Sequence, residues 1–354
     1  MQRPSVFTML PGVLVMFVTV LLGMLVPMKA SAHITVLLYH KFDEIDSPST
    51  STPSGMFEQQ MAYLKENDYA VLSMEQLQGC MEGRITIPEK GVVITLDDGD
   101  LSEYTRAFPV LKRYGYPFCI FIYTRAPGAP GFMNWDQIRE IRRHGGDVGS
   151  HTHTHPYLID LSPHEIDQEL TRSKKILERE LGAEVRWFAY PFGQYDASCR
   201  DAAVKAGYTL VFTSDPGSVG EHTNREAIPR QAIVGQNMDM KRFVEKVNTP
   251  PLDIDGRIPD MGRLPGTSLP EITITIRNPE LYFPDQVQVF LSEKGRLPAK
   301  FDPEAGTLSC PGPIEITRKV NRIITTARRR SDRAFAMYSY MIVLPSGQSP
   351  GSDQ

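Results

Sequence analysis

The chain has 354 residues and a formal net charge of −4 at pH 7. This length is sufficient for one large domain of about 200–250 residues and a smaller one. Because the net charge is small and negative, composition gives no reason to expect a nucleic acid as a partner, and we predict none.

The N-terminus has the features of an export signal. An apolar run extends from about residue 9 to residue 28, and Ala30-Ser31-Ala32 is a small-residue cleavage site. We therefore predict a signal peptide over residues 1–32, and export to the periplasm or the extracellular space. The apolar run also approaches the length of a membrane span. An uncleaved anchor that associates the protein with the membrane or envelope is the alternative.

Strand and helix patterns alternate from residue 33 to residue 249. Apolar, β-branched runs predict seven strands, with segments of helical periodicity between them. This alternation favours a parallel sheet with helices outside, and seven β/α units predict a barrel with one unit fewer than eight. The predicted strands cover residues 34–39, 92–96, 118–123, 147–150, 187–190, 209–213 and 228–234.

The composition changes after residue 249. Prolines and glycines are frequent in residues 250–270, which we predict to be a linker. Residues 271–345 carry short alternating runs with turn residues between them, and they predict a small β-sandwich-like accessory domain. The polar tail, residues 346–354, is predicted to be disordered.

The accessory domain is predicted to bind carbohydrate or another partner. It contains a local basic cluster that would suit an anionic envelope polymer, and a solvated strand face is the alternative. The cluster consists of Arg318, Lys319, Arg322, Arg328, Arg329, Arg330 and Arg333.

The second predicted strand runs directly into Asp97, Asp98 and Gly99. A strand that is apolar on both faces belongs to a buried parallel sheet, and such sheets carry their chemistry at the carboxyl ends of the strands. Gly99 permits a sharp turn, and two adjacent carboxylates call for a compensating cation. Asp-Asp-Gly is also ordinary turn chemistry, so this motif alone does not predict a site.

Three histidines follow the fourth predicted strand, in the 151–155 stretch His-Thr-His-Thr-His. His151 and His155 are four residues apart, which brings both imidazoles to one side. Together with the Asp98 carboxylate they suit a divalent ion, zinc above all, with Co²⁺, Mn²⁺ or Fe²⁺ also compatible, and they leave positions open for water and substrate. A solvated polar loop is the alternative. We expect His153 to support the ligands from outside the metal-binding set or to be structural.

The fifth predicted strand ends in Tyr190-Pro191-Phe192-Gly193. Such an end directs a backbone N–H into a pocket while aromatic side chains wall it. We therefore predict that Tyr190 and Pro191 contact a substrate. An ordinary exit from strand to turn is the alternative.

In order and spacing, these three stretches resemble the first three motifs of the polysaccharide deacetylases, carbohydrate esterase family 4. The 38–42 stretch, Leu-Tyr-His-Lys-Phe, resembles the opening strand of exported members. Parts of residues 51–60 resemble members that act on poly-N-acetylglucosamine of the biofilm matrix. The resemblance covers about residues 34–247 and implies a distorted (β/α)7 barrel.

The resemblance also implies roles for individual residues. Asp97 would be the general base. Asp98, His151 and His155 would hold the metal ion, and the backbone N–H of Phe192 would help to stabilise an oxyanion.

Two positions depart from the family pattern. Many members have an arginine where this chain has Ala189, and that arginine orients the base. We predict that Arg230 or Arg186 takes over the orientation of Asp97, with a salt bridge or a solvated charge as the alternative for each. The late Leu-x-His motif is also missing, so no general acid is assigned.

The resemblance predicts an exported, metal-dependent hydrolase that removes N-acetyl groups from N-acetylglucosamine residues of a cell-surface or matrix polysaccharide. Two alternatives remain open. One is a metal-dependent amidase or deformylase that acts on another envelope substrate. The other is a catalytically degenerate carbohydrate-binding protein.

Overall fold

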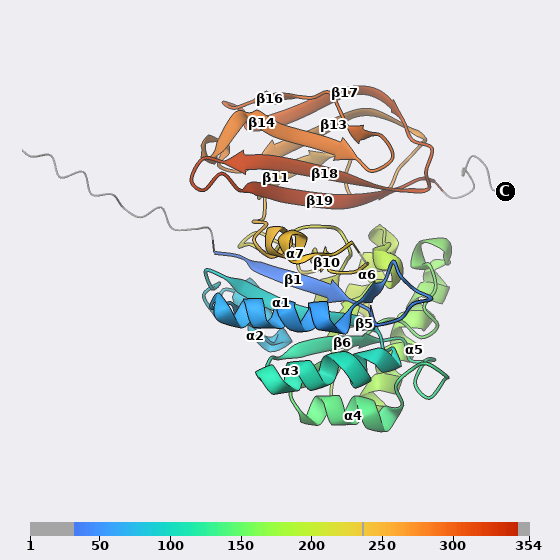
Figure 1. The fold of residues 1–354 in the computed structure, drawn as a ribbon. Coiled ribbons are helices and arrows are strands. Elements are labelled where there is room, and N and C mark those ends of the chain that lie inside the picture. Colours follow the sequence, from blue (N-terminus) through green and yellow to red (C-terminus); the bar gives the residue numbers. More distant parts are fainter. Residues whose placement is uncertain (1–31, 236, 346–354) are drawn as a thin grey trace, which may run out of the picture.

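The computed structural model describes residues 32–235 and 237–345, which form two regions of different architecture (Figure 1). The predicted disordered tail and nearly all of the predicted signal peptide lie outside these residues. Among the residues described, no helix is long and apolar enough to span a membrane.

The N-terminal region is a distorted (β/α)7 barrel, as predicted. Its parallel strands follow the order β10-β1-β5-β6-β7-β8-β9, and a bridge between Phe212 and Ile228 links β9 to the segment before β10. The last strand is shorter than predicted, because Pro229 has no N–H to donate to a ladder. The strands are β1 (Ile34–Tyr39), β4 (Ala70–Val71), β5 (Gly91–Asp98), β6 (Phe118–Ile122), β7 (Gly146–Ser150), β8 (Trp187–Ala189), β9 (Leu210–Phe212) and β10 (Gln231–Ala232), besides a separate pair, β2 (Lys41–Phe42) and β3 (Ser51–Thr52).

Helices cover the outside of the barrel (Figure 1). Ser73, Asn134 and Ser162 each accept a hydrogen bond from the backbone N–H three residues later, and a side chain at that position bonds back, so three helices begin with a capping box. The helices are α1 (Ser54–Glu66), α2 (Met74–Met81), α3 (Phe108–Tyr114), α4 (Trp135–Arg143), α5 (Pro163–Leu181), α6 (Ala197–Lys205) and α7 (Met240–Val247), with a π-helical turn, η1 (Glu103–Ala107), before α3.

The sheet is buried on both faces, which explains its continuous apolar runs. On β5, Val92 and Ile94 pack toward the helices, whereas Val93 belongs to the cluster inside the barrel. By the same alternation, Thr95 and Asp97 follow Val93 on the interior face, and both are buried.

The C-terminal region is a β-sandwich. One sheet has the order β11-β13-β17-β16 and the other β12-β19-β18-β14-β15, with apolar side chains such as Val289 and Ile323 between them. Burial alternates along β18, as expected for a strand with one face in a core. The strands are β11 (Ile254–Ile258), β12 (Gly262–Arg263), β13 (Ser268–Ile276), β14 (Tyr282–Leu291), β15 (Gly295–Arg296), β16 (Lys300–Asp302), β17 (Thr307–Glu315), β18 (Val320–Arg329) and β19 (Phe335–Val343).

The prediction that residues 250–270 are a linker is wrong. They contain β11 and β12, and these strands pair with β13 and β19 of the sandwich. Local proline and glycine content suggested an irregular segment, but pairing with distant strands satisfies the backbone of its central part.

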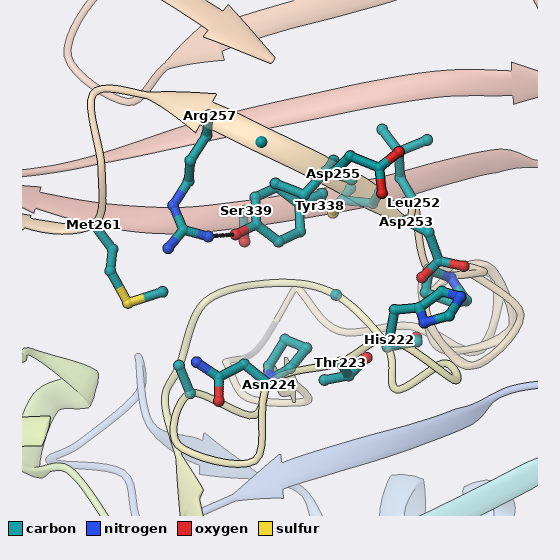
Figure 2. A pocket seen from close by; sticks show the side chains of 18 of the residues that line it. His222, Thr223, Asn224, Leu252, Asp253, Asp255, Arg257, Met261, Tyr338 and Ser339 are labelled. Atoms are coloured by element: carbon teal, nitrogen blue, oxygen red, sulfur yellow. Dashed lines mark hydrogen bonds between the residues drawn. The ribbon is translucent and has the colours of Figure 1, made fainter. Parts of the chain in front are cut away.

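The sandwich lies against the barrel through β18, β19 and the segment before β11. Ser339 Oγ of β19 donates to Pro216 O at 2.6 Å, Arg263 of β12 forms an ion pair with Asp196 at 3.0 Å, and Lys319, next to β18, forms one with Asp160. A cavity of about 410 Å³ lies between the two regions, and Figure 2 shows its lining. None of the predicted catalytic or metal-binding residues lines this cavity.

Candidate active site

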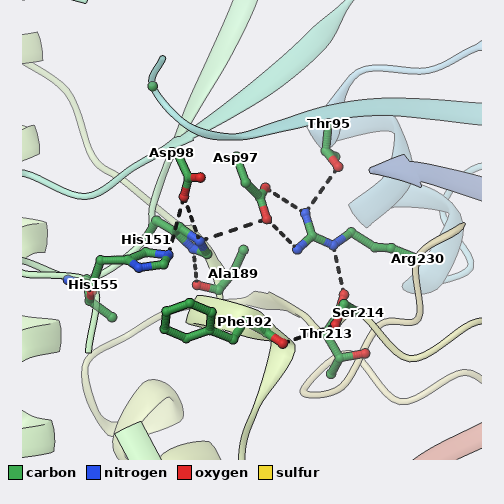
Figure 3. A network of polar contacts seen from close by, with 12 residues as sticks. Thr95, Asp97, Asp98, His151, His155, Ala189, Phe192, Thr213, Ser214 and Arg230 are labelled. Atoms are coloured by element: carbon green, nitrogen blue, oxygen red, sulfur yellow. Dashed lines mark hydrogen bonds and ion pairs between the residues drawn. The ribbon is translucent and has the colours of Figure 1, made fainter. Parts of the chain in front are cut away.

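The carboxyl end of β5 presents both aspartates to the same site. Alternation would send adjacent side chains of a strand to opposite faces, but Asp98 has a φ of 87° and Gly99 a φ of 79°. These left-handed conformations end the extended run. As a result, Asp97 Oδ2 and Asp98 Oδ1 lie 3.9 and 3.6 Å from the same atom, His151 Nε2 (Figure 3).

The histidine loop folds tightly after β7. Thr152 and His155 both have positive φ, and the Thr152 hydroxyl accepts a hydrogen bond from the His155 N–H at 3.0 Å. This turn brings His155 Nε2 to 3.3 Å from Asp98 Oδ1. One ligand atom from each of Asp98, His151 and His155 lies within 4.8 Å of the other two.

The protonation states of these groups fit a cation. His151 shares a 2.7 Å hydrogen bond between its Nδ1 and Ala189 O, which leaves Nε2 directed at the carboxylates. Burial lowers the pKa of His151 to about 4, despite the opposing charge of Asp97, so its imidazole is neutral at pH 7.

Asp98 completes the candidate metal centre. Burial alone would raise the pKa of this carboxyl, but the imidazole of His155 at 3.3 Å and the charges of His151 and His40 bring it well below its usual range. Among the described residues, nothing donates a hydrogen bond to Asp98 Oδ1, although this oxygen is buried. A buried, ionised oxygen with a free lone pair beside two imidazoles is a donor set that fits a divalent first-row metal ion.

Arg230 holds Asp97 with a planar fork. Its Nη1 and Nη2 donate to the two carboxylate oxygens at 2.8 and 2.7 Å, and its Nε donates to Thr213 O at 2.8 Å (Figure 3). Both partners are buried, with Asp97 2% exposed and Arg230 1% exposed. Burial raises the pKa of Asp97, but the charges of Arg230 and His151 outweigh it and lower the pKa below its ordinary value.

Arg186, the other arginine proposed to orient Asp97, lies elsewhere. It forms an ion pair with Glu75 and stacks on the Trp187 ring, with 4.4 Å between its guanidinium carbon and the ring centroid. Arg186 therefore forms a salt bridge with Glu75, which was the alternative to a role in orienting Asp97.

Phe192 sits beside the histidines in a left-handed conformation, with a φ of 58°. Phe192 is 45% exposed. Its ring centroid lies 4.6 Å from that of the His155 ring and 3.9 Å from that of the Tyr157 ring, on which it stacks. The site therefore has an exposed aromatic rim next to its charged centre.

Comparison with known proteins agrees with this geometry. The family model described as "Polysaccharide deacetylase" matches residues 84–211, which span the carboxylate, histidine and Phe192 motifs. The Bacillus subtilis (strain 168) protein YxkH, a relative named for polysaccharide deacetylation, is 31% identical over 202 residues, which are 57% of this chain and 72% of that protein. The chain belongs to the polysaccharide deacetylase family.

Two further similarities concern a narrower group of these deacetylases. The poly-beta-1,6-N-acetyl-D-glucosamine N-deacetylase of Staphylococcus aureus (strain MSSA476) is 29% identical over 198 residues, covering 52% of this chain and 68% of that enzyme. The solved structure of IcaB from Ammonifex degensii superposes with a TM-score of 0.54 at 28% identity and covers 58% of this chain and 93% of that one.

Family membership establishes the type of enzyme. This polysaccharide deacetylase is a hydrolase of non-peptide carbon–nitrogen bonds. Deacetylases of this family are metal-dependent, and the Asp98, His151 and His155 cluster is the place where the chain can hold the ion.

The prediction that the Tyr190 side chain contacts the substrate is wrong. Tyr190 is 0% exposed, and its ring stacks on Tyr195 at 5.0 Å within the deacetylase core. Pro191 is also buried, and it begins the short 3₁₀ turn that places Phe192 at the surface. The aromatic–proline pattern indicated a wall of the site, but only the tertiary packing shows which ring is exposed.

Sequence reasoning missed two residues of the deacetylase site. His40 follows β1, and its charge lowers the pKa of both Asp97 and Asp98; its Nδ1 is buried without a hydrogen bond in the described chain. Glu103 is buried and accepts hydrogen bonds from the backbone N–H groups of Gly99 and Asp100, both at 3.1 Å, so it supports the turn after Asp98. For His40, a histidine at the carboxyl end of the first strand was the available signal.

Proposed function

We propose that this polysaccharide deacetylase is exported and removes N-acetyl groups from N-acetylglucosamine residues of a cell-surface or matrix polysaccharide, with a zinc ion in its site. One observation carries the proposal: the candidate general base lies beside the metal-binding cluster. Asp97, which forms an ion pair with Arg230, is 3.9 Å from His151 of the cluster formed by Asp98, His151 and His155. Relatives named as poly-beta-1,6-N-acetylglucosamine deacetylases support this substrate class.

Asp97 acts as the general base in this mechanism. A divalent cation, when bound, polarises the amide carbonyl and makes water more acidic. Asp97 accepts the proton of the attacking water as the oxygen adds to the carbonyl carbon. The Arg230 fork keeps Asp97 ionised and fixes the direction of its oxygens, since a two-pronged contact leaves the carboxylate little freedom to rotate.

The negative charge then develops on the former carbonyl oxygen. We assign its stabilisation to the backbone N–H of Phe192, whose left-handed conformation sets the direction of that peptide group beside His155. The exposed, stacked rings of Tyr157 and Phe192 offer a flat apolar surface to a sugar ring next to the reacting group.

His40 is our candidate for the general acid. Collapse of the tetrahedral intermediate breaks the carbon–nitrogen bond and requires a proton on the departing sugar amine, and acetate is the other product. The charge of His40 lowers the pKa values of Asp97 and Asp98, and its buried Nδ1 has no hydrogen-bond partner in the described chain. It therefore takes the place of the missing late histidine in this proposal.

Acetate release by residues 33–354 tests the function. The substrates are poly-β-1,6-N-acetylglucosamine, chitin oligomers and peptidoglycan fragments, each with and without a chelator, beside the variant Asp97→Asn. We expect chelator-sensitive release from poly-β-1,6-N-acetylglucosamine, and a loss of about 10²–10⁴-fold in Asp97→Asn with metal still bound. No release from any glycan by metal-loaded protein would favour the amidase or binding-protein alternatives.

The metal and the compartment need separate measurements. Elemental analysis of protein purified without added metal identifies the ion, and iron or manganese in place of zinc would overturn that part of the proposal. Fractionation of cells that produce the full chain shows whether it reaches the periplasm or the medium, or stays with the membrane. Accumulation in the cytoplasm would contradict export.

A further inference from the structure

The loop that follows β9 contacts both parts of the catalytic machinery. Thr213 O accepts the hydrogen bond from Arg230 Nε at 2.8 Å, and Asp215 O accepts one from the Arg230 backbone N–H at 3.0 Å. Between them, Ser214 Oγ donates to Phe192 O at 3.3 Å (Figure 3). Residues 213–215 thus hold the arginine that orients the base and the residue assigned to the oxyanion.

Steric packing makes the second of these contacts rigid. Gly193 has a φ of 63°, and a Cβ added to it would lie 1.8 Å from Ser214 Oγ and 2.6 Å from Ser214 N. The backbone of residues 192–193 therefore lies directly on Ser214. A shift of Ser214 should move the 192–193 peptide group, because no side chain separates the two segments, and this peptide group is joined through the Phe192 Cα to the one that carries the Phe192 N–H.

The accessory domain holds this loop in place. Asp215 is 2% exposed, and Arg322 of β18 donates to its carboxylate through Nε at 2.8 Å. The same guanidinium donates through Nη2 to Ser214 Oγ at 3.0 Å. Tyr195 supplies a third contact, from its hydroxyl to Asp215 Oδ2 at 3.0 Å.

Arg322 matters more than the other contacts of this loop, because it supplies the positive charge that pairs with the buried carboxylate of Asp215. Burial raises the pKa of Asp215, and the charge and hydrogen bond of Arg322 oppose this. Removal of one partner of a buried ion pair leaves the other uncompensated, so the loop must move or take up a proton. Loss of Arg322 also removes its bond to Ser214 Oγ, and movement of the loop would disturb the hydrogen bonds that Thr213, Ser214 and Asp215 make to Arg230 and Phe192.

We propose that Arg322 is a positioning residue for deacetylation. Through Asp215 and Ser214, it holds the 213–215 loop in the conformation that places Arg230 on Asp97 and Phe192 at the oxyanion. The β-sandwich is thus part of the catalytic unit and contributes to kcat, which a module that only binds polymer does not do. The inference rests on the proposed function for its kinetic readout but has a second readout that does not require activity.

The kinetic test compares Arg322→Ala with Lys319→Ala in the full mature chain. Lys319 also pairs with a barrel residue, Asp160, but makes no described contact with the 213–215 loop, so it controls for loss of an interdomain ion pair. We expect kcat to fall at least tenfold in Arg322→Ala, with KM within about twofold and metal content unchanged, whereas Lys319→Ala stays within twofold of the parent. The Arg322 side chain is 28% exposed, so added guanidinium ion should reach the vacated position and restore kcat several-fold.

Hydrogen exchange supplies the readout that is independent of activity. In Arg322→Ala, peptides that cover residues 190–194, 211–216 and 228–232 should exchange faster, and in Lys319→Ala they should not. If Arg322→Ala fails to fold, Arg322→Lys replaces it. Lysine keeps the positive charge but cannot bond to Asp215 and Ser214 with the geometry of a guanidinium, so the same measurements apply with a smaller expected effect. Unchanged kcat, or unchanged exchange in all three segments, would overturn the proposal. Inactive parent protein with the expected exchange pattern would count against the proposed function alone.

Discussion

The two buried interiors of this protein treat polar groups differently. The barrel buries ionised groups at the carboxyl ends of its strands, with Asp97 paired to Arg230 and His151 beside them. The interior of the sandwich is mainly apolar, with side chains such as Ile274, Val289 and Ile323, and the polar side chains buried beside Ile323 on β18, such as Thr325, are neutral. Parallel strands bring many backbone ends and loops to one place and can compensate charge there, whereas two facing antiparallel sheets mainly exclude water. Substitutions in the first interior should therefore change chemistry as well as stability, and those in the second should change stability alone.

The largest effect is expected at a metal ligand. Replacement of a residue that only supports a ligand typically costs about 10–100-fold in metal affinity, so loss of the ligand itself in His151→Ala should cost at least about 100-fold. Zinc titration of chelator-treated protein measures this. The matched control is His153→Ala in the same loop, because His153 bonds to Thr124 Oγ1 at 2.8 Å and not to the cluster. Equal affinity in the two variants would contradict our assignment of the ligands.

The next largest effect is expected at the buried ion pair between Asp97 and Arg230. Arg230→Met leaves Asp97 without its partner inside the barrel, and we expect a loss of about 3–5 kcal/mol in the free energy of unfolding, together with loss of deacetylation. Urea denaturation measures the first effect. The double variant with Asp97→Asn removes both charges and should recover part of the stability but none of the activity. A single variant as stable as the parent would refute the tight pairing.

The core of the sandwich provides the opposite case. Leu291 is fully buried at the end of β14, and Leu291→Ala should lower the free energy of unfolding by about 2–5 kcal/mol. At a temperature where the variant is folded, its kcat should stay within twofold of the parent, because β14 makes no described contact with the 213–215 loop. A fall in kcat with intact fold would mean that the whole sandwich, and not Arg322 in particular, supports the site.

A pH-dependent effect is expected at Glu103. Burial, with the charges of Asp98 and Asp100, raises the pKa of this carboxyl well above its usual value. Because the folded state holds the proton more tightly than the unfolded state, this stability is present below the ordinary value of about 4.3 and is lost as the pH rises through the folded pKa. Glu103→Gln keeps the acceptor of the Gly99 N–H without titrating. In chelator-treated protein, the parent should therefore lose stability relative to this variant as the pH rises above about 4.3, and a constant difference would contradict the raised pKa.

The smallest effect is expected at Arg186. Its ion pair with Glu75 lies at the surface, with side chains 32% and 56% exposed, and such pairs contribute about 0.2–1 kcal/mol. Arg186→Ala should leave kcat unchanged. A loss of activity comparable to that of Arg230→Met would show that Arg186 also supports the base.

Much of the barrel was predictable because its signals are local. Continuous apolar runs identify buried parallel strands, and capping residues such as Ser162 mark helix starts. The pairing of β12 with β19 was not predictable, because a partner far away in the sequence overrides the composition of the 250–270 segment. The burial of Tyr190 was not predictable for a similar reason. Tyr190 and Phe192 are both aromatic residues of one short segment, and only their packing in the fold shows that Tyr190 is buried and Phe192 exposed.

The sequence by itself determined the donor set: Asp98 at the end of one strand, and two histidines after another strand of the same sheet. The carboxyl ends of parallel strands meet at one edge, so spacing was sufficient to bring these residues together. Only the tertiary structure decided between Arg186 and Arg230 as the partner of Asp97. Arg230, which forms the ion pair, lies 133 positions away from Asp97 in the chain. Tertiary structure alone also placed Arg322, from a different domain, against the loop that holds Arg230. Charge compensation in a buried site depends on which groups are close in space, and no local pattern records that distance.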